Sequence, residues 1–275
     1  MTHGETLVIT KTQVPDQYRR PLDDQIATYN QGRSIQQVAR IPDTKDMPLD
    51  DRRHWLKIPG VICVYVDMVG STLLSATNHE KSTAGAFQLF TDTAVRLFDT
   101  FDAAYIDVRG DGVFALFDVD QPYRAVASAI TFKTFAKEEF VPRVEKDTGL
   151  TLGAHIGIDQ KTVLVKKLGI RQRGGRGDRQ NEVWAGKPVN MAAKLASRTS
   201  AGQLLASDRF FNRITHERVR MSCGCPNGVP KPLWTERDVS ADRIFDFDKA
   251  YLLDSNWCST HGAAFCDSVM RLDKC

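Results

Sequence analysis

Long apolar runs are missing from this sequence of 275 residues. No stretch approaches the roughly twenty apolar residues that a membrane-spanning helix needs, and the N-terminal segment lacks the apolar core of a secretory signal. We therefore expect a cytoplasmic protein that does not bind a membrane.

A strong excess of charge is missing as well. The chain has 37 Lys and Arg residues against 34 Asp and Glu residues, which gives a formal net charge of +3. A protein that binds nucleic acid non-specifically usually concentrates a larger positive excess on one face. We therefore expect no nucleic-acid partner.

Cysteine is scarce until late in the chain, where five of the six cysteines follow residue 220 and only Cys63 precedes it. This distribution is unlike the disulfide framework of a small secreted domain. Four C-terminal residues form a candidate zinc set, because sulfur and imidazole nitrogen are typical zinc ligands: Cys223, Cys225, Cys258 and His261. Cys-x-Cys is a less usual zinc spacing than Cys-x2-Cys, so free buried thiols are the simpler interpretation.

Composition divides the chain into three parts. Residues 1–57 are polar and punctuated by proline, residues 58–217 show regular apolar periodicity, and residues 218–275 are enriched in Cys and Trp with weak periodicity. We expect an N-terminal extension, a catalytic domain and a Cys-rich C-terminal appendage, in that order.

Apolar periodicity in the central part predicts alternating strands and helices. The expected order is a strand, a helix, a hairpin, a second helix, a further pair of strands and a third helix, at 61–66, 72–101, 104–119, 122–146, 150–159 with 162–170, and 188–198. This β-α-β-β-α-β order predicts a ferredoxin-like α+β fold with helices on one face of the sheet.

Two aspartates stand where this strand order brings distant segments together. Asp67 ends the apolar strand VICVYV, and Asp111 lies in the Gly-Asp-Gly turn of the hairpin. The two carboxylates should converge, and they repel one another unless a cation lies between them. Hard divalent ions bind carboxylates together with substrate phosphates, so the pair predicts metal-dependent phosphoryl or nucleotidyl transfer. The alternative is that Asp67 and Ser71 cap a helix while Asp111 fills a turn, each a common use of these residues.

The segment Val69 to Thr72 follows Asp67 at once. Gly70 allows a tight turn, and Val69, Gly70, Ser71 and Thr72 offer backbone N–H groups at the start of the next helix, where the helix dipole favours an anion. We expect this loop to hold the triphosphate of a nucleotide.

Four motifs resemble the catalytic domain of the class III nucleotidyl cyclases. They are YVDMVGST, RGDGVFALF, HIGID and VWAGKPVNMAAKLAS, and the similarity covers about residues 58–217. The resemblance implies an enzyme that converts a nucleoside triphosphate to a 3′,5′-cyclic monophosphate and pyrophosphate. It also implies a homodimer with shared active sites, in which one chain supplies the metal residues and the other supplies an Asn-bearing helix.

The resemblance further assigns the metal and ribose residues. It implies two Mn²⁺ or Mg²⁺ ions per site, bound by Asp67, Asp111 and the backbone carbonyl of Met68. Asn190 corresponds to the residue that positions the ribose.

One catalytic position departs from the family pattern. The family usually places a transition-state Arg four residues beyond the Asn, where this chain has Lys194. Lysine supplies charge but no bidentate fork, so we expect Arg198, one turn later on the helix, to share the role.

The positions that select the base depart from those of the purine cyclases. Four residues before Asp111, where adenine-specific members usually have Lys, this chain has Asp107, and two residues before the Trp of the last motif it has Glu182. Two acids do not reproduce the donor and acceptor pair that reads adenine. Tyr65 and Tyr105 are candidates to narrow the pocket for a pyrimidine, and packing within the sheet is the alternative role for each.

These departures and the Cys-rich tail resemble the pyrimidine cyclases of the Pycsar antiphage systems. The resemblance implies a uridylate cyclase that makes cyclic UMP from UTP as a second messenger, and a separate effector that the product activates. A cytidylate cyclase is the first alternative, followed by an adenylate or guanylate cyclase. An inactive module that binds nucleotide and regulates a partner is the alternative from another functional class, and Lys194 in place of Arg is its main support.

Overall fold

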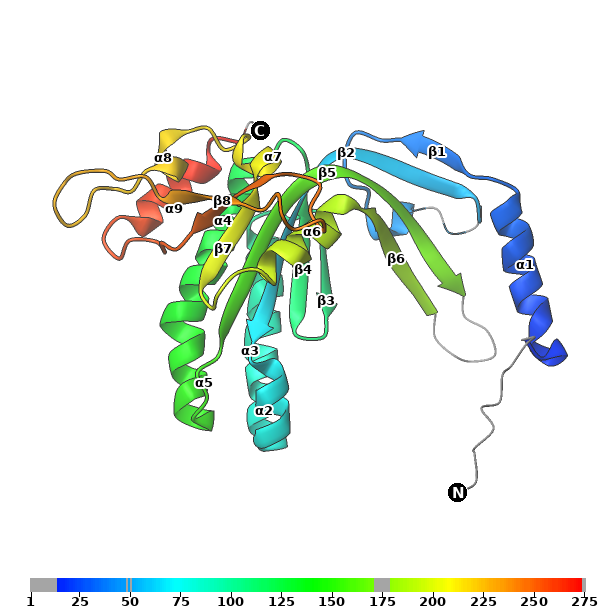
Figure 1. The fold of residues 1–275 in the computed structure, drawn as a ribbon, viewed down its shortest axis with the longest axis horizontal. Coiled ribbons are helices and arrows are strands. Elements are labelled where there is room, and N and C mark those ends of the chain that lie inside the picture. The colour runs from blue at the N-terminus through cyan, green and yellow to red at the C-terminus, as the bar shows by residue number, and fades with distance from the viewer. Residues whose placement is uncertain (1–13, 48, 50, 171–178, 274–275) are drawn as a thin grey trace, which may run out of the picture.

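The computed structural model describes residues 14–273 except residues 48, 50 and 171–178. In this part of the chain one mixed sheet of nine strands organises the molecule (Figure 1). The strand order is β3-β4-β2-β5-β7-β9-β8, with β1 paired to β2 and β6 paired to β5. The strands are β1 (Ser34–Gln37), β2 (His54–Val69), β3 (Tyr105–Arg109), β4 (Gly112–Phe117), β5 (Gly153–Ile170), β6 (Arg179–Gly186), β7 (Gln203–Ser207), β8 (Trp234–Asp238) and β9 (Lys249–Leu253). The arrangement β3-β4-β2-β5 is the ferredoxin-like one, so the expected α+β fold is confirmed.

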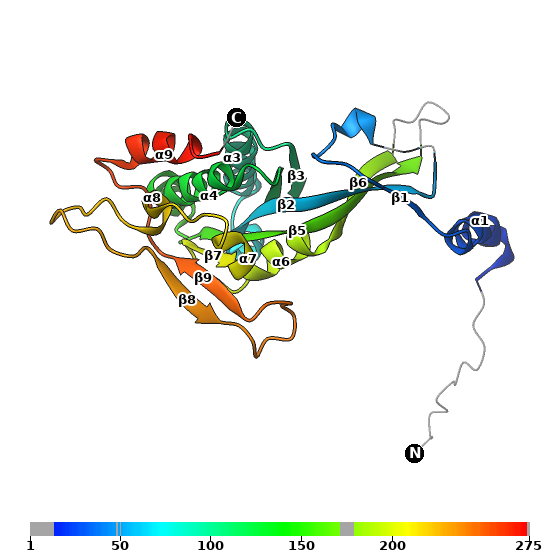
Figure 2. The ribbon, with the colours of Figure 1, turned by 90° about the horizontal axis from the view of Figure 1, so that it is seen from above.

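Helices cover both faces of this sheet, so the expectation of helices on one face alone is wrong (Figure 2). Seen from above, α3, α4 and α9 lie on one side of β2 and β5, and α6 lies on the other (Figure 2). The described helices are α1 (Arg19–Asn30), α2 (Ser71–Thr77), α3 (Glu80–Thr100), α4 (Pro122–Phe135), α5 (Val141–Thr148), α6 (Lys187–Ala196), α7 (Asp208–Phe211), α8 (Glu217–Arg220) and α9 (Gly262–Met270). Among the described residues, no helix combines the length and the apolar character that crossing a bilayer requires.

The alternation of side chains along β2 decides which face carries the predicted site. Val64, Val66 and Met68 are buried in the core shared with α3 and α4, whereas Cys63 and Tyr65 pack into a second cluster on the opposite face. Side chains alternate with a period of two along a strand, so Asp67 projects from the same face as Cys63 and Tyr65. This second face is also the one that α6 covers.

Two predicted helices are interrupted. The helix expected over 72–101 divides into α2 and α3 at Asn78, which has an extended backbone and donates a side-chain hydrogen bond to Thr77 at 3.1 Å. Such local bonds of short polar side chains compete with the helix. The helix expected over 122–146 contains a π-helical turn at Ala136–Phe140, and Pro142 just beyond it has no N–H to continue the regular pattern.

The strand pair expected over 150–170 is wrong, because one continuous strand, β5, runs through it. The sequence between the two predicted strands contains neither Gly nor Pro. The irregularity lies instead in the partner strand β2, whose register with β5 shifts between Ile58 and Val61. Gly60 adopts a left-handed φ of 68° there, which glycine tolerates.

The sheet continues across both predicted domain boundaries. Strand β2 begins at His54, before residue 58, and β9 pairs with β7, so residues after 217 extend the same sheet. The division into parts at 1–57, 58–217 and 218–275 rests on amino-acid composition and stays a prediction.

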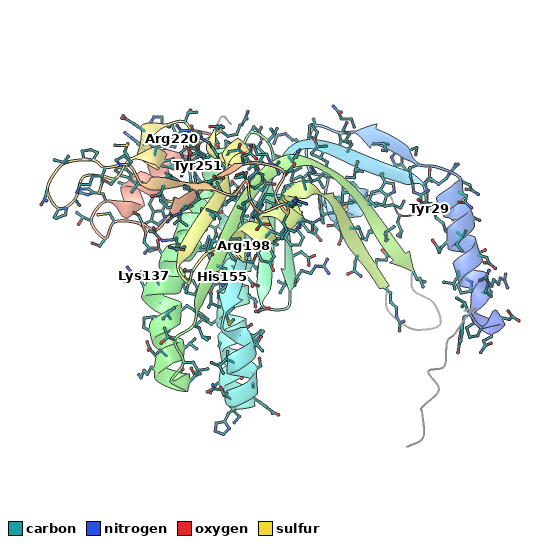
Figure 3. All side chains as sticks on the ribbon, viewed as in Figure 1. Tyr29, Lys137, His155, Arg198, Arg220 and Tyr251 are labelled. Atoms are coloured by element: carbon teal, nitrogen blue, oxygen red, sulfur yellow. The ribbon has the colours of Figure 1, made fainter. Side chains whose placement is uncertain are left out.

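Helix α1 stands apart from the sheet, and none of its residues is buried (Figures 1 and 3). Four exposed apolar side chains recur at helical spacing along it and the turn before it: Tyr18, Leu22, Ile26 and Tyr29. The described part of the chain leaves this stripe uncovered.

Candidate active site

The structure places the two predicted metal aspartates side by side. Asp67, near the end of β2, is paired in register with Gly112 of β4, and Asp111 directly precedes Gly112. Burial, followed by the negative charge of Asp111, raises the pKa of Asp67 from 3.8 to about 6. The Tyr65 hydroxyl donates to the Asp67 carboxylate at 3.4 Å. This convergence follows from the strand order that the sequence predicted.

Gly112 leaves the space that the Asp67 carboxylate occupies. A Cβ atom at this position would lie 2.3 Å from the Tyr65 hydroxyl oxygen and 2.8 Å from an Asp67 carboxylate oxygen. Real Cβ atoms do not approach other atoms so closely. The second glycine of the Gly-Asp-Gly turn therefore leaves room for the Tyr65 and Asp67 side chains of the neighbouring strand.

The donor set fits a hard divalent cation. It consists of oxygen atoms from two partly buried carboxylates, and a cation between them would relieve their mutual repulsion. The side chain of Met68 is buried in the α3–α4 core, and its backbone carbonyl stays a predicted ligand.

The loop predicted to bind a triphosphate forms the junction of β2 and α2. Val69 ends the strand, Gly70 takes a left-handed φ of 84°, and α2 begins at Ser71. No side chain caps α2 in the described structure, so the helix-cap role considered for Ser71 and Asp67 is absent there. The backbone N–H groups of Ser71 and Thr72, in the first turn of α2, are the ones that an α-helix leaves without an intrahelical partner.

Helix α6 carries the predicted ribose and transition-state residues. Asn190 is exposed and Lys194 is half-buried, one turn apart on the helix. Arg198 lies just beyond the end of α6, and its guanidinium donates to Asp242 at 2.6 Å (Figure 3). This ion pair ties the Arg198 side chain to the β8–β9 loop. The catalytic role expected for Arg198 beside Lys194 stays a prediction.

The height of α6 above the sheet is set by Gly157 of the HIGID motif. A Cβ atom at Gly157 would lie 1.9 Å from the backbone oxygen of Ala192 and 2.6 Å from the backbone nitrogen of Ala196. Because both contacts are with backbone atoms, no side-chain rotation can relieve them. The helix that carries Asn190 therefore crosses β5 at a point where only glycine fits.

We expect Gly157→Ala to destabilise the protein and to reduce activity. Overpacking of this kind costs about 2–3 kcal/mol, or about 5–10 °C in Tm, and displacing a positioning group by about 1 Å costs about a hundredfold in rate. Thermal unfolding and steady-state kinetics measure the two effects. Gly85→Ala is the matched control, because no atom lies within 4 Å of the added methyl group in α3, and helix propensity predicts a gain of about 0.5–1 kcal/mol. An unchanged Tm for Gly157→Ala would contradict the close approach.

A single carboxylate in the β8–β9 loop holds three elements of the site together. Asp246 accepts hydrogen bonds from Lys161 of β5 at 2.5 Å, Lys187 of α6 at 2.7 Å and Arg209 of α7 at 2.9 Å. Although partial burial opposes ionisation, these cations lower the pKa of Asp246 far below its usual value. Arg209 also pairs with the fully buried Asp159 of the HIGID motif.

The predicted base residues Tyr105 and Glu182 are in contact. The Tyr105 hydroxyl donates to the Glu182 carboxylate at 3.3 Å, and the Tyr105 ring packs on Trp184 with centroids 4.7 Å apart. Burial raises the pKa of Tyr105 to about 12, so the hydroxyl stays protonated. Lys167 of β5 lies 3.8 Å from the other oxygen of Glu182. Glu182 and Lys167 therefore place an acceptor and a donor side by side.

The other two predicted base residues have different partners. Asp107 forms an ion pair with Arg109 at 2.5 Å on the same strand. Tyr65 lies between the carboxylate pair and the second core cluster, and burial and both aspartates raise its pKa. Tyr65 therefore belongs to the surroundings of Asp67, while Tyr105 belongs to those of Glu182.

The structure brings the predicted residues together in three groups. The Asp67–Asp111 pair, the Tyr105–Glu182 pair and α6 are separate, and in the described chain no hydrogen bond or ion pair joins Asn190 to either carboxylate. Sequence reasoning missed Lys167, because its partnership with Glu182 depends on the register of β5 with β6, in which the two residues are opposite one another.

The four C-terminal candidates also come together, at a distance along the chain from these groups. Cys223, Cys225, Cys258 and His261 form one cluster. Two of their thiols differ in acidity: hydrogen bonding and charge from neighbouring cysteines raise the pKa of Cys225 to about 11, while backbone N–H groups lower that of Cys258 to about 6.

Comparisons with known proteins agree with this geometry. A uridylate cyclase of Propioniciclava tarda is 37% identical over 236 residues, which cover 84% of this chain and 75% of the relative. A uridylate cyclase of Micromonospora echinofusca is 34% identical over 236 residues, which cover 83% of this chain and 75% of the relative. No family model matches the chain.

Solved structures show the same fold at low identity. The adenylyl cyclase CyaB from P. aeruginosa superposes with a TM-score of 0.58 at 16% identity, covering 74% of this chain and 96% of the cyclase. The β-α-β-β-α-β sheet that carries Asp67, Asp111 and α6 is therefore the cyclase fold.

Proposed function

We propose that this chain, which belongs to the uridylate cyclase family of nucleotidyl cyclases, converts UTP to 3′,5′-cyclic UMP and pyrophosphate at the Asp67–Asp111 site. The observation that carries the proposal is the convergence of the two carboxylates at the end of β2 in a chain with these relatives. The two carboxylates repel one another unless a cation lies between them, and a metal ion held in this way is what metal-dependent nucleotidyl transfer needs.

Each group of residues then has a role in the reaction. Asp67, Asp111 and the Met68 carbonyl hold two Mn²⁺ or Mg²⁺ ions, which supply Lewis acidity and neutralise phosphate charge when bound. The N–H groups of residues 69–72 bind the triphosphate at the start of α2. Catalysis then depends mainly on positioning the 3′-hydroxyl for in-line attack on the α-phosphorus and on stabilising the charge that develops.

Helix α6 supplies the groups that orient the sugar and the phosphate. Asn190 is exposed and free to hydrogen-bond the ribose, and Lys194 places a positive charge one turn away. Within the described part of one chain no hydrogen bond or ion pair joins the carboxylate pair to Asn190, which supports a homodimer in which α6 of a second copy completes each site. The uncovered apolar stripe of α1 is a second feature that supports dimerisation.

The Glu182–Lys167 pair supports a pyrimidine substrate. Uracil presents an N3–H donor beside the O4 acceptor, so a carboxylate that accepts and an ammonium that donates match its edge. Tyr105 is held against both Glu182 and Trp184 and limits the space for a larger base. Cytosine offers a donor and an acceptor on the same edge, so a cytidylate cyclase is the second candidate.

By resemblance to the Pycsar cyclases, the product serves as a second messenger in antiphage defence. A separate effector that binds cyclic UMP would read the signal. The cytoplasm, which holds the nucleoside triphosphates, is the compartment that we propose for the enzyme.

The proposal is tested by incubating the purified protein with an equimolar mixture of ATP, GTP, CTP and UTP plus Mn²⁺, and resolving the products by mass. We expect cyclic UMP to dominate, with one pyrophosphate released per cyclic nucleotide. Dominant cyclic CMP would select the second candidate. Dominant cyclic AMP or cyclic GMP would overturn the pyrimidine assignment, and nucleotide binding without pyrophosphate release would indicate the inactive module.

A further inference from the structure

A cluster of three sulfurs and one imidazole lies in the C-terminal part of the chain. Cys223 and Cys225 stand on the loop after α8, while Cys258 and His261 stand on the segment between β9 and α9. The four ligand atoms all lie within 4.8 Å of one another. His261 Nδ1 is 3.2 Å from the sulfur of Cys225 and 3.9 Å from the sulfur of Cys258.

These distances match a tetrahedral zinc site. Zinc–sulfur bonds of about 2.3 Å and zinc–nitrogen bonds of about 2.0 Å place tetrahedral ligand atoms about 3.5–3.8 Å apart. Nδ1 of His261 faces both sulfurs, so it is the ligating nitrogen, and Nε2 is left for solvent or a neighbouring group.

The loop that carries two of the sulfurs is shaped to present them. Gly224, between Cys223 and Cys225, takes a left-handed φ of 88°, and a Cβ there would lie 2.8 Å from the backbone of Gly228. The Ser222 hydroxyl accepts from the N–H groups of Gly224 at 3.3 Å and Lys231 at 2.9 Å, which closes the loop at its base. The short Cys-x-Cys spacing is therefore compatible with a site, because the glycine between the cysteines allows both sulfurs to reach the same point.

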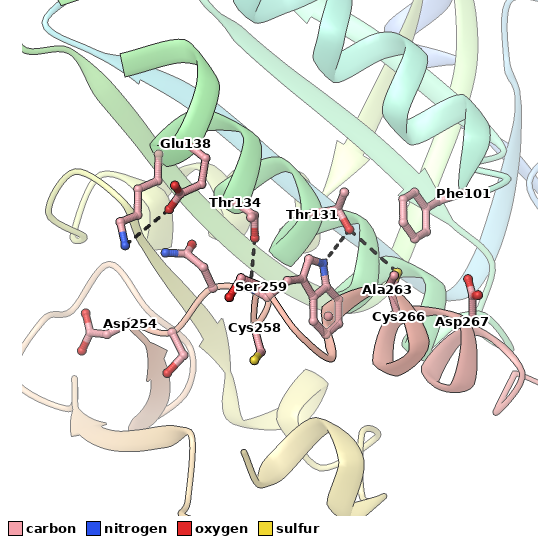
Figure 4. Close-up of a pocket in the computed structure, with 15 residues that line it drawn as sticks. Phe101, Thr131, Thr134, Glu138, Asp254, Cys258, Ser259, Ala263, Cys266 and Asp267 are labelled. Atoms are coloured by element: carbon pink, nitrogen blue, oxygen red, sulfur yellow. Dashed lines mark hydrogen bonds and ion pairs between the residues drawn. The ribbon is translucent and has the colours of Figure 1, made fainter. Parts of the chain in front are cut away.

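The other half of the cluster is ordered by its own backbone. The Gly262 N–H donates to the Cys258 carbonyl at 2.7 Å, which closes the turn that holds Cys258 and His261. In Figure 4 the Cys258 sulfur points away from the α4 side chains, whereas the Cys266 sulfur lies beside Thr131, 3.9 Å from its hydroxyl. Cys266 therefore packs against α4 and takes no part in the cluster.

We propose that Cys223, Cys225, Cys258 and His261 bind one structural zinc ion. Four protein ligands fill a tetrahedral sphere and leave no position for water or substrate, which is typical of structural zinc and not of catalytic zinc. The three thiols release their protons to solvent on binding. This assignment is independent of the nucleotide site, whose oxygen ligands suit Mg²⁺ or Mn²⁺.

The ion would join the loop after α8 to the segment between β9 and α9. It ties the loop preceding β8 to the start of α9, a helix that packs on α4. Trp257, next to Cys258, donates from its indole N–H to Thr131 of α4 at 2.8 Å, so the metal-bearing segment is anchored to the domain core (Figure 4). Zinc would thus fix the C-terminal residues against the catalytic domain.

Metal content of the full-length protein tests the proposal. We expect about one zinc ion per chain by plasma mass spectrometry after purification without chelator, and an intense visible absorption typical of tetrahedral thiolate coordination after replacement by Co²⁺. Cys225→Ser and Cys258→Ser should each lose the zinc and unfold at lower temperature. Cys266→Ser, a cysteine on α9 outside the cluster, should retain it.

A second variant separates this site from the nucleotide site. The double variant Asp67→Asn/Asp111→Asn should keep about one zinc per chain, because its lost ligands are oxygen atoms elsewhere. If purified wild-type protein contains no zinc and its Tm is unchanged by added zinc, the proposal is wrong. Zinc retained in Cys258→Ser, or lost in the Asp67→Asn/Asp111→Asn variant, would also overturn it. The zinc readouts require no turnover, so they stand whether or not the cyclase proposal holds.

Discussion

Asp67→Asn is expected to abolish cyclic nucleotide formation while leaving the fold intact. The substitution keeps the size of the side chain but removes the charge that holds a divalent cation opposite Asp111. Metal ions stabilise transition-state charge by several kcal/mol, so we expect a loss of about a thousandfold or more in kcat/KM. Pyrophosphate release and product mass measure the effect, and a wild-type rate in this variant would sink the metal assignment.

The same substitution should stabilise the metal-free protein. Folding raises the pKa of Asp67 from 3.8 to about 6, so the ionised form is disfavoured in the folded state. This penalty is absent below pH 4, grows between pH 4 and 6, and is complete above pH 6. After a discount for the solvent exposure of Asp67, it is about 1 kcal/mol, or about 2–4 °C in Tm. In chelator at pH 8, Asp67→Asn should therefore unfold at a higher temperature than the wild type, and the difference should vanish below pH 4.

Added Mn²⁺ should reverse this order. The ion stabilises a chain that binds it and leaves the variant unchanged, so the wild type becomes the more stable protein. A variant that gains as much Tm from Mn²⁺ as the wild type would show that the stabilising ion binds elsewhere.

Mixing two inactive variants tests whether active sites are shared. Asp67→Asn lacks a metal ligand and Asn190→Ala lacks the ribose-positioning residue, but a heterodimer of the two contains one site with every residue intact. If subunits exchange freely, equal amounts should recover about a quarter of the wild-type activity, since half of the dimers are mixed and each has one working site of two. No recovery after verified subunit exchange would mean that each chain completes its own site.

Glu182→Gln is expected to shift substrate preference from UTP towards CTP. The carboxylate only accepts hydrogen bonds, which suits N3–H of uracil, whereas the glutamine amide can donate to N3 of cytosine and accept from its amino group. The amide carbonyl still accepts from N3–H of uracil but lacks the carboxylate charge, a loss of about 1 kcal/mol, so kcat/KM for UTP should fall about 5- to 10-fold while that for CTP rises. Competition between UTP and CTP in one reaction measures the change in preference.

The chain offers a matched control for this substitution. Glu236 on β8 accepts from the Tyr251 hydroxyl at 3.1 Å and pairs with Lys249 at 2.8 Å, which repeats the Tyr105–Glu182–Lys167 arrangement away from the site. Glu236→Gln should leave the UTP to CTP ratio unchanged. Equal effects of the two substitutions, or none from Glu182→Gln, would remove Glu182 from base selection.

The convergence of Asp67 and Asp111 was predictable because it depends on strand order alone. A β-α-β-β order makes the first and third strands neighbours, and the aspartates stand at the ends that meet. The fold class followed from the same periodicity. Such features need no knowledge of exact register.

Features that depend on register or on contacts between distant segments were not predictable. The Glu182–Lys167 pair requires the alignment of β5 with β6, and the break at Asn78 reflects local side-chain bonding that periodicity does not report. The fit of Gly157 beneath α6 requires the path of the helix across the sheet. The cysteine spacing suggested ligands but not that two loops, 33 residues apart between Cys225 and Cys258, would meet.

The contacts of Asp246 bear on when during synthesis the enzyme becomes active. Its partners Lys161, Lys187 and Arg209 leave the ribosome earlier, and until residue 246 follows them they lack the carboxylate that neutralises all three. A nascent chain, or one cut within the β8–β9 loop, would thus contain Asp67, Asp111 and Asn190 while Lys187 of α6 still lacks its carboxylate partner. Full cyclic nucleotide synthesis is therefore expected only from a chain whose C-terminal hairpin is complete.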